Sequence, residues 1–160
     1  MKLKKVYLMC GTPGSGKSTW IQQQMKNEPG LWCSRDKVRF SLVSENEEYF
    51  SKEDEVFDTW IGYINNGIKS VFYNVIYIDA THLSQKSRNK TLDKLNLTDV
   101  DIIPVVFNIS LDTCLQRNNL RNGRERVPES AVRNMYKTFI NSPITFNEKY
   151  KYTEIITITE

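Results

Sequence analysis

Apolar and polar residues alternate along this chain in blocks that predict strands and helices by turns. Short apolar runs, typical of buried strands, occur at residues 6–9, 31–33, 75–79, 102–107 and 155–158. Between these runs, the pattern predicts helices at residues 18–25, 57–68, 83–95 and 111–120, and another that is entered through Pro128. Strands that alternate with helices indicate an α/β fold with a doubly wound, five-stranded parallel sheet.

Two helical stripes and one acidic stretch stand out in this pattern. The stripes are spaced for one helix face each, and they comprise Phe57, Trp60, Ile61, Ile64 and Ile68, then Val132, Met135, Tyr136 and Phe139. We interpret both as core packing and not as binding sites. Residues 45–58 hold seven acidic side chains against Lys52 alone, which we interpret as a solvated charged face. Pro104, within the fourth strand, indicates an early or irregular position in that strand.

Composition supports one globular domain over residues 1–160, because 39% of the residues are hydrophobic and 26% are charged. Three scattered cysteines and one histidine, His82, predict buried thiols in a reducing compartment and no zinc site. No apolar run is long enough for a membrane span or a signal peptide, so we expect no membrane partner. The expected location is the cytoplasm, or the cytoplasm of an infected host.

A glycine-rich motif directly follows the first predicted strand and opens the first predicted helix. It consists of Gly11, Thr12, Pro13, Gly14, Ser15, Gly16, Lys17, Ser18 and Thr19. In this P-loop pattern, backbone N–H groups surround phosphate oxygens at the positive end of a helix. The lysine, Lys17, reaches the β- and γ-phosphates, and the Ser18 hydroxyl is a magnesium ligand. The motif therefore predicts binding of ATP with Mg²⁺.

The kind of P-loop protein follows from what the remaining sequence lacks. A GTPase needs an Asn-Lys-x-Asp motif to read guanine, and the nearest string, at residues 147–150, does not match it. ATPase motors usually place a water-activating Glu after the strand-end Asp, but Ala80 follows Asp79 here. Transfer to an acceptor other than water remains, so the sequence favours a kinase.

Polar residues follow three of the predicted strands at their carboxyl ends. Gly11, Asp36 and Asp79 occupy these positions, and a parallel sheet brings such ends to one edge. An acceptor hydroxyl needs a carboxylate to take its proton, and Asp36 is the candidate. If a helix begins there, Asp36 and Arg39 share one helix face and hold hydroxyl and phosphate together. The alternative is that Asp36 only caps that helix.

Four arginines lie between residues 117 and 126, and they suggest a short arginine lid. Arg117 and Arg121 are spaced i, i+4 at a helix end that runs into Asn122-Gly123, a good hinge. Mobile arginines neutralise the charge that develops on a transferring phosphoryl group and exclude water. Arg124 and Arg126 fit either this role or an ordinary solvated surface.

Several motifs together resemble the kinase domain of bacteriophage polynucleotide 5′-kinases. They are PGSGKSTW, Asn27-Glu28-Pro29-Gly30, Arg35-Asp36-x-x-Arg39, Ile78-Asp79-Ala80-Thr81-x-Leu83, Leu115-x-Arg117-Asn118-x-x-Arg121, Val127-Pro128 and Met135-Tyr136-Lys137. The resemblance covers nearly the whole chain up to about residue 140. It implies that ATP phosphorylates the 5′-hydroxyl end of DNA or RNA, which is the expected partner. The net charge of +3 fits a short footprint on such a strand.

The resemblance also implies roles for individual residues. Asp36 resembles the general base, Arg39 the contact to the acceptor phosphate, and Arg121 the transition-state arginine, with help from Arg117. Asp79 and Thr81 resemble residues of the acceptor site. His82 stands where such enzymes commonly have Asn, so it is interpreted as a loop residue or a substrate contact.

The chain departs from the bifunctional members of that family because it has no Asp-x-Asp-Gly motif, so we expect no 3′-phosphatase activity. The alternative function is a P-loop kinase of a small acceptor, either a nucleoside or a nucleoside monophosphate. A hydroxymethylated base in DNA is a further acceptor, and an ATP-binding regulatory module is the non-enzymatic alternative. The sequence leaves the oligomeric state open.

Overall fold

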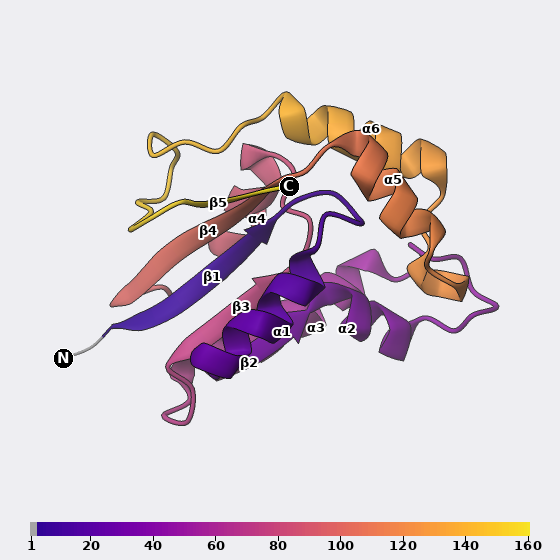
Figure 1. The fold of residues 1–160 in the computed structure, drawn as a ribbon. Helices are drawn as coiled ribbons and strands as arrows, with labels where there is room; N and C mark the ends of the chain where they lie inside the picture. The colour runs from indigo at the N-terminus through magenta and orange to yellow at the C-terminus, as the bar shows by residue number, and fades with distance from the viewer. Residues whose placement is uncertain (1–2) are drawn as a thin grey trace.

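The computed structural model describes residues 3–160, and its centre is one sheet of five parallel strands (Figure 1). The strands are β1 (Lys4–Cys10), β2 (Leu31–Ser34), β3 (Val75–Asp79), β4 (Val100–Asn108) and β5 (Ile156–Thr159). Their order across the sheet is β2-β3-β1-β4-β5, and every neighbouring pair is parallel. The predicted α/β class with five parallel strands is confirmed.

The connections between the strands are mostly helical. The helices are α1 (Lys17–Asn27), α2 (Arg35–Leu42), α3 (Glu53–Lys69), α4 (Gln85–Leu92), α5 (Leu111–Asn119), the short 3-10 helix η1 (Gly123–Glu125) and α6 (Glu129–Ile140). The helix predicted at 83–95 is shorter than expected. Ser84 caps it by accepting a hydrogen bond from the Ser87 N–H, and it ends at Leu92 before Asp93.

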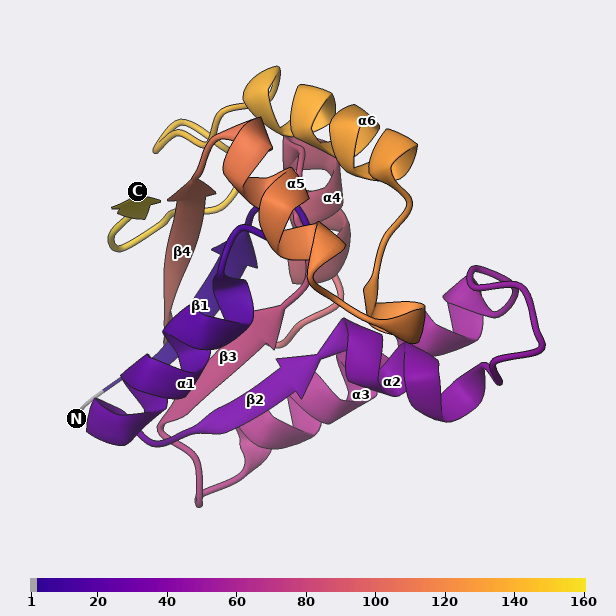
Figure 2. The same cartoon turned by 45° about the vertical axis from the view of Figure 1, so that its right-hand side comes forward.

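Alternate residues of β1 face the two layers of helices. Val6 and Leu8 pack against the apolar face of α3, whereas Tyr7 and Met9 pack towards α1 and α5. Figure 2 shows α1 and α3 on opposite faces of the sheet. The stripe predicted on residues 57–68 is buried against the first of these faces, as expected for core packing. Helices therefore cover both faces of the sheet, as predicted for a doubly wound fold.

The carboxyl ends of the strands form the edge at which the site lies. β1 leads into the P-loop, β2 into α2, and β3 ends at Asp79. The segment with α5, η1 and α6 lies above this edge, and η1 reaches towards α2 (Figure 2). Pro104 is the fifth of the nine residues of β4, so the expected early position in that strand is wrong. It lies one residue before Val105, where the pairing with β5 begins. β4 therefore tolerates the missing N–H at a point that β5 does not yet cover.

The three cysteines are buried and unpaired with one another, as predicted. Among residues 3–160, no helix is both long enough and apolar enough to cross a membrane.

Candidate functional site

The P-loop has the backbone conformation that its glycines permit. Gly14 and Gly16 have φ angles of 81° and 100°, in the left-handed region that other residues rarely adopt. A Cβ atom at Gly14 would lie 2.4 Å from the carbonyl oxygen of Cys114, so α5 packs directly on the loop. The Thr12 hydroxyl shares a hydrogen bond of 3.2 Å with the Cys114 thiol. The loop is therefore held between β1, α1 and α5.

The Lys17 side chain crosses the mouth of this loop. Its ammonium donates hydrogen bonds to the carbonyl oxygens of Gly11 and Thr12, at 3.0 and 2.9 Å. Burial lowers the pKa of Lys17 below its ordinary value, while the carboxylates of Asp79 and Asp36 act in the opposite direction. The ammonium therefore lies against the loop in a site that also holds carboxylates.

The residues present fit a nucleotide phosphate and a magnesium ion. The Ser15 hydroxyl oxygen is buried inside the loop, next to Gly11, with no hydrogen-bond partner in the described structure, so it is a polar group free to bond a ligand. Ser18 and Thr19 are exposed in the first turn of α1. Residues 3–160 contain no cluster of three or more side chains that could hold a metal ion by themselves. A magnesium ion would therefore depend on the Ser18 hydroxyl and on phosphate oxygens.

One cleft of about 610 Å³ adjoins the P-loop and collects residues from distant parts of the chain. Its lining includes these predicted site residues: Pro13, Lys17, Ser18, Asp36, Arg39, Asp79, Thr81 and Arg121. The topological argument from the strand ends therefore places Asp36 and Asp79 beside the lysine of the loop. Arg117 and Thr19 are not part of this lining.

Asp36 lies in the first turn of α2, but it does not cap the helix. Ser34 is the N-cap, and its hydroxyl accepts a hydrogen bond from the Lys37 N–H at 3.2 Å. The alternative interpretation of Asp36 as a cap is wrong, because the residue two positions earlier performs that task. The Asp36 carboxylate instead accepts a hydrogen bond of 2.5 Å from Arg39 and one of 3.3 Å from the Tyr49 hydroxyl.

Arg39 is held by a residue that the sequence analysis missed. Its Nε and Nη2 donate to the two carboxylate oxygens of Glu53, at 2.7 and 3.0 Å, and Nη1 also donates to Tyr49 at 3.2 Å. Arg39 is buried, and four bonds leave it one uncommitted N–H of its five. Arg39 therefore joins Asp36 and Tyr49 to Glu53 of α3.

Glu53 also accepts a hydrogen bond of 3.1 Å from Arg35, so one carboxylate serves two arginines of α2. The interpretation of residues 45–58 as a purely solvated face is wrong at this position. The first residue of α3 turns into the cleft because two guanidinium groups on α2 need a shared counter-charge. The only hint in the sequence was the i, i+4 spacing of Arg35 and Arg39, which places both on one helix face.

Asp79 lies at the end of β3 and is buried. Its Oδ2 accepts a hydrogen bond of 2.9 Å from the indole N–H of Trp32 on β2. Burial raises the pKa of Asp79 above its ordinary value, although the charge of Lys17 and this hydrogen bond partly offset the effect. Nearby, the Thr81 carbonyl accepts a hydrogen bond of 2.9 Å from the Gly11 N–H, which ties β3 to the start of the P-loop.

The arginines of the lid segment divide into different roles. Arg121 lines the cleft, and its charge contributes to the lowered pKa of Lys17. Arg117 approaches the loop, where its Nη1 lies 3.5 Å from the Gly14 carbonyl oxygen. Arg124 donates to the Val43 carbonyl and lies over the Phe40 ring, so it docks the lid segment on α2. Arg126 is exposed on the surface.

Met135 of α6 corrects one prediction about the helical stripes. It lines the cleft instead of the core, because α6 lies over the carboxyl ends of the strands and not over a face of the sheet (Figure 2). Val132 of the same helix is fully buried, as predicted.

His82 is buried behind the site and does not line the cleft. Its Nδ1 lies 2.8 Å from the Met9 carbonyl oxygen, which can only accept, so Nδ1 carries the proton. Nε2 then accepts from the Thr91 hydroxyl at 3.0 Å. Burial lowers the pKa of His82 to about 4, so the ring is neutral at pH 7. Of its two interpretations, the substrate contact is not supported by this geometry.

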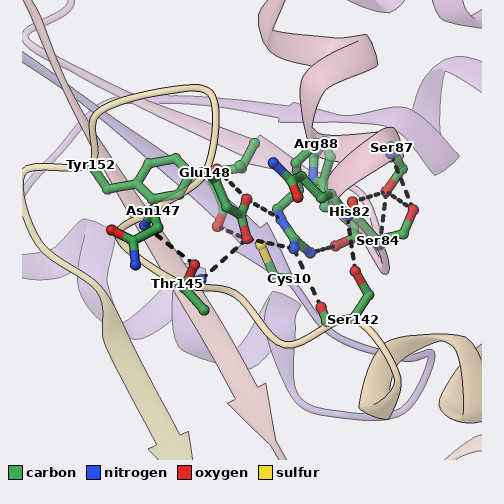
Figure 3. Close-up of polar contacts among 12 residues, drawn as sticks. Cys10, His82, Ser84, Ser87, Arg88, Ser142, Thr145, Asn147, Glu148 and Tyr152 are labelled. Carbon is green, nitrogen blue, oxygen red and sulfur yellow. Dashed lines mark hydrogen bonds and ion pairs between the residues drawn. The ribbon is translucent and has the colours of Figure 1, made fainter.

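A buried ion pair holds the same loop from the other side (Figure 3). Arg88 of α4 donates to both carboxylate oxygens of Glu148, at 3.0 and 2.8 Å, and to the His82 carbonyl at 3.1 Å. Tyr152 donates its hydroxyl proton to Glu148 at 2.9 Å. The segment after α6 is thereby fastened to the loop that follows Asp79. Nothing in the spacing of these residues indicated the contact.

Comparison with known families places the chain in a class. A family model described as an AAA domain matches residues 6–141, and the chain belongs to this family of P-loop proteins. The five-stranded parallel sheet and the conformation of the P-loop agree with this class.

Solved structures share the fold while differing in the acceptors that their names give. A chain of the Pnkp1/Rnl/Hen1 RNA repair complex is 22% identical with a TM-score of 0.75, over 89% of this chain and 46% of that one. A fungal RNA kinase is 15% identical with a TM-score of 0.63, over 99% and 75%. A gluconokinase from Sinorhizobium meliloti 1021 is 15% identical with a TM-score of 0.60, over 99% and 84%. The chain spans about half the length of the repair-complex protein.

Proposed function

We propose that this protein transfers the γ-phosphoryl group of ATP to the 5′-hydroxyl end of a DNA or RNA strand. The observation that carries the proposal is the single cleft that holds both Lys17 of the P-loop and the Asp36 carboxylate. A phosphate-binding lysine alone serves any P-loop protein. A carboxylate positioned by hydrogen bonds beside it serves an acceptor that must lose a proton.

On the donor side, the P-loop amides and Lys17 would bind the phosphates, and the Ser18 hydroxyl would hold Mg²⁺. The bound metal ion supplies charge neutralisation on the β- and γ-phosphate oxygens. Arg121, which lines the cleft from the lid segment, would neutralise charge on the transferring group, with Arg117 close to the loop.

On the acceptor side, Asp36 would accept the proton of the attacking hydroxyl. The hydrogen bonds from Arg39 and Tyr49 fix its carboxylate, so that the proton acceptor needs little reorganisation. Asp79 and Thr81 would complete the wall of the acceptor site. The remaining N–H of Arg39 is available to an acceptor phosphate.

Two observations support a nucleic-acid end over a small acceptor. The Arg35-Asp36-x-x-Arg39 motif resembles that of polynucleotide kinases, and the structure places all three residues on the lining of the cleft. An RNA repair protein and an RNA kinase are among the proteins that share the fold. The second candidate is a kinase of a small acceptor, which the shared fold of the gluconokinase favours.

The test is to offer labelled ATP and Mg²⁺ with 5′-hydroxyl oligonucleotides, nucleosides, nucleoside monophosphates and gluconate. We expect label on the oligonucleotides, and a Lys17→Ala variant to lose roughly a hundredfold or more in rate. Label on a small acceptor alone would refute the polynucleotide proposal. Near-normal turnover by Lys17→Ala would refute the assignment of the P-loop.

A further inference from the structure

Three aromatic side chains form one wall of the cleft. Phe40 lies on α2, and Tyr49 and Phe50 lie on the loop between α2 and α3. The Tyr49 and Phe50 ring centroids are 4.6 Å apart, and those of Phe40 and Tyr49 are 6.2 Å apart. Phe50 is 55% exposed, although its side chain is large and apolar. An exposed aromatic ring inside a polar cleft indicates a contact surface.

Charged groups of the site hold this wall in place. The Arg39 guanidinium lies 4.8 Å from the Tyr49 ring centroid and 5.5 Å from that of Phe50. The Arg124 guanidinium of the lid segment lies 4.5 Å from the Phe40 ring centroid. The Tyr49 hydroxyl donates a hydrogen bond to Asp36, so this ring of the wall contacts the group that would take the acceptor proton. The wall therefore belongs to the acceptor side of the cleft.

We infer that Phe50 stacks on a nucleobase of the acceptor strand, an inference that rests on the proposed function. With the 5′-hydroxyl at Asp36, the adjoining part of the acceptor would lie along Tyr49 and Phe50. A flat apolar ring next to a guanidinium matches a nucleobase with its neighbouring phosphate. A sugar acid has no flat π face, so such a ring would give it no comparable contact.

The same wall predicts which nucleobases this subsite accepts. Stacking is tolerant of sequence because every base has a π face. Arg39 bonds to Glu53 and Tyr49 bonds to Asp36, and the one N–H left on Arg39 would serve an acceptor phosphate and not a base. The subsite therefore accepts any of the four bases, and it binds an abasic end less tightly.

The experiment compares Phe50→Ala with the wild-type protein on 5′-hydroxyl oligonucleotides. Two further substrates carry a tetrahydrofuran abasic residue at the first or the second position. We expect Phe50→Ala to raise the oligonucleotide KM roughly 5- to 100-fold, as measured for the loss of base–aromatic stacking. The KM for ATP should change by less than about twofold, because the ring contacts only the acceptor. One of the abasic substrates should cause the same loss in the wild-type protein and no further loss in Phe50→Ala.

Two variants serve as controls. Phe50→Tyr keeps an aromatic face and should restore the oligonucleotide KM. Phe146→Ala removes a ring of similar exposure, 61%, outside the cleft and should change neither KM.

The outcomes separate the inference from the proposed function. Phosphorylation of oligonucleotides with an unchanged KM in Phe50→Ala overturns the inference and leaves the function standing. A raised KM for ATP alone overturns it too, because the ring would then contact the adenine of the donor. Absence of any oligonucleotide product from the wild-type protein overturns the proposed function and the inference with it.

Discussion

Two arginine–glutamate pairs in this protein have nearly the same geometry and opposite surroundings. Arg39 donates hydrogen bonds of 2.7 and 3.0 Å to Glu53 beside the cleft, and Arg88 donates hydrogen bonds of 3.0 and 2.8 Å to Glu148. The Glu53 side chain is 28% exposed, whereas that of Glu148 is 4% exposed. Water can therefore solvate Glu53 in the cleft if its arginine is lost, but it cannot reach Glu148.

The first ion pair therefore positions a residue of the site, whereas the second holds two distant segments of the fold together. The Arg39–Glu53 pair also fixes Asp36, the proposed base. The Arg88–Glu148 pair instead joins α4 to the segment after α6, and it contacts the site only through the His82 carbonyl (Figure 3). Disruption of the first should therefore lower activity, and disruption of the second should lower stability.

The largest effect is expected at the carboxylate beside the cleft pair. Asp36→Asn keeps the shape of the side chain but cannot accept a proton, so turnover should fall about 10²- to 10⁴-fold. The free energy of unfolding should stay near that of the wild type. Steady-state kinetics and urea titration measure the two quantities, with the exposed Asp58→Asn as control. A rate within a few-fold of wild type would contradict the role of Asp36 and make Asp79 the next candidate base.

The buried pair should respond in the opposite manner. Glu148→Gln leaves the Arg88 charge unpaired in the interior, so it should cost about 3–5 kcal/mol in unfolding free energy. Activity of the remaining folded protein should change little. The surface counterpart Glu129→Gln, which breaks the exposed pair with Arg133, should cost about 0–1 kcal/mol. Equal losses for the two variants in urea titrations would contradict the comparison.

A double variant sharpens this point. Arg88→Met combined with Glu148→Leu removes both charges, so it should be less destabilised than Glu148→Gln by itself.

A smaller effect on activity is expected from Glu53→Gln. Arg39 would lose its main counter-charge and hold Asp36 less firmly, so turnover should fall roughly ten- to a hundredfold. The unfolding free energy should fall less than in Glu148→Gln, because the buried Arg39 guanidinium keeps the Asp36 carboxylate as a counter-charge. Kinetics and urea titration of the same preparation test both parts. A loss of stability as large as that of Glu148→Gln, with normal turnover, would reverse the assignment of the two pairs.

The smallest expected difference lies in the acid dependence of stability. Burial raises the pKa of Glu148, but hydrogen bonds from Arg88 and Tyr152 together with the Arg88 charge bring it below its ordinary 4.5. A carboxyl whose pKa is lowered on folding stabilises the protein above its unfolded pKa and loses this contribution as pH falls through the folded pKa. Stability should therefore decline below about pH 4.5.

Glu148→Gln should show a shallower decline over this range than the wild type. Glu53, whose pKa Arg39 and Arg35 also lower against the effect of burial, should contribute in the same direction. Unfolding titrations from neutral to acidic pH measure the slopes, and identical slopes for wild type and Glu148→Gln would contradict the assigned direction.

The sequence by itself determined the sheet and the donor side of the cleft. Strand periodicity and the P-loop motif are local patterns, because glycine conformation, helix start and lysine position depend on residues close in the chain. The meeting of Gly11, Asp36 and Asp79 also followed, since parallel strands end at one edge. The cap of α2 was equally local, and Ser34 before Arg35 would have revealed it.

Only the tertiary structure decided which charges meet across the fold. In the sequence, Glu53 is one of seven acidic residues within residues 45–58. Only the packing of α3 beside α2 brings its carboxylate to Arg39. Glu148 lies sixty residues beyond Arg88, and no spacing rule links them. His82 is buried and hydrogen-bonded to the Met9 carbonyl because the loop after β3 packs beneath the P-loop. Such contacts depend on the packing of elements distant in sequence, and a pattern of neighbouring residues carries no record of that packing.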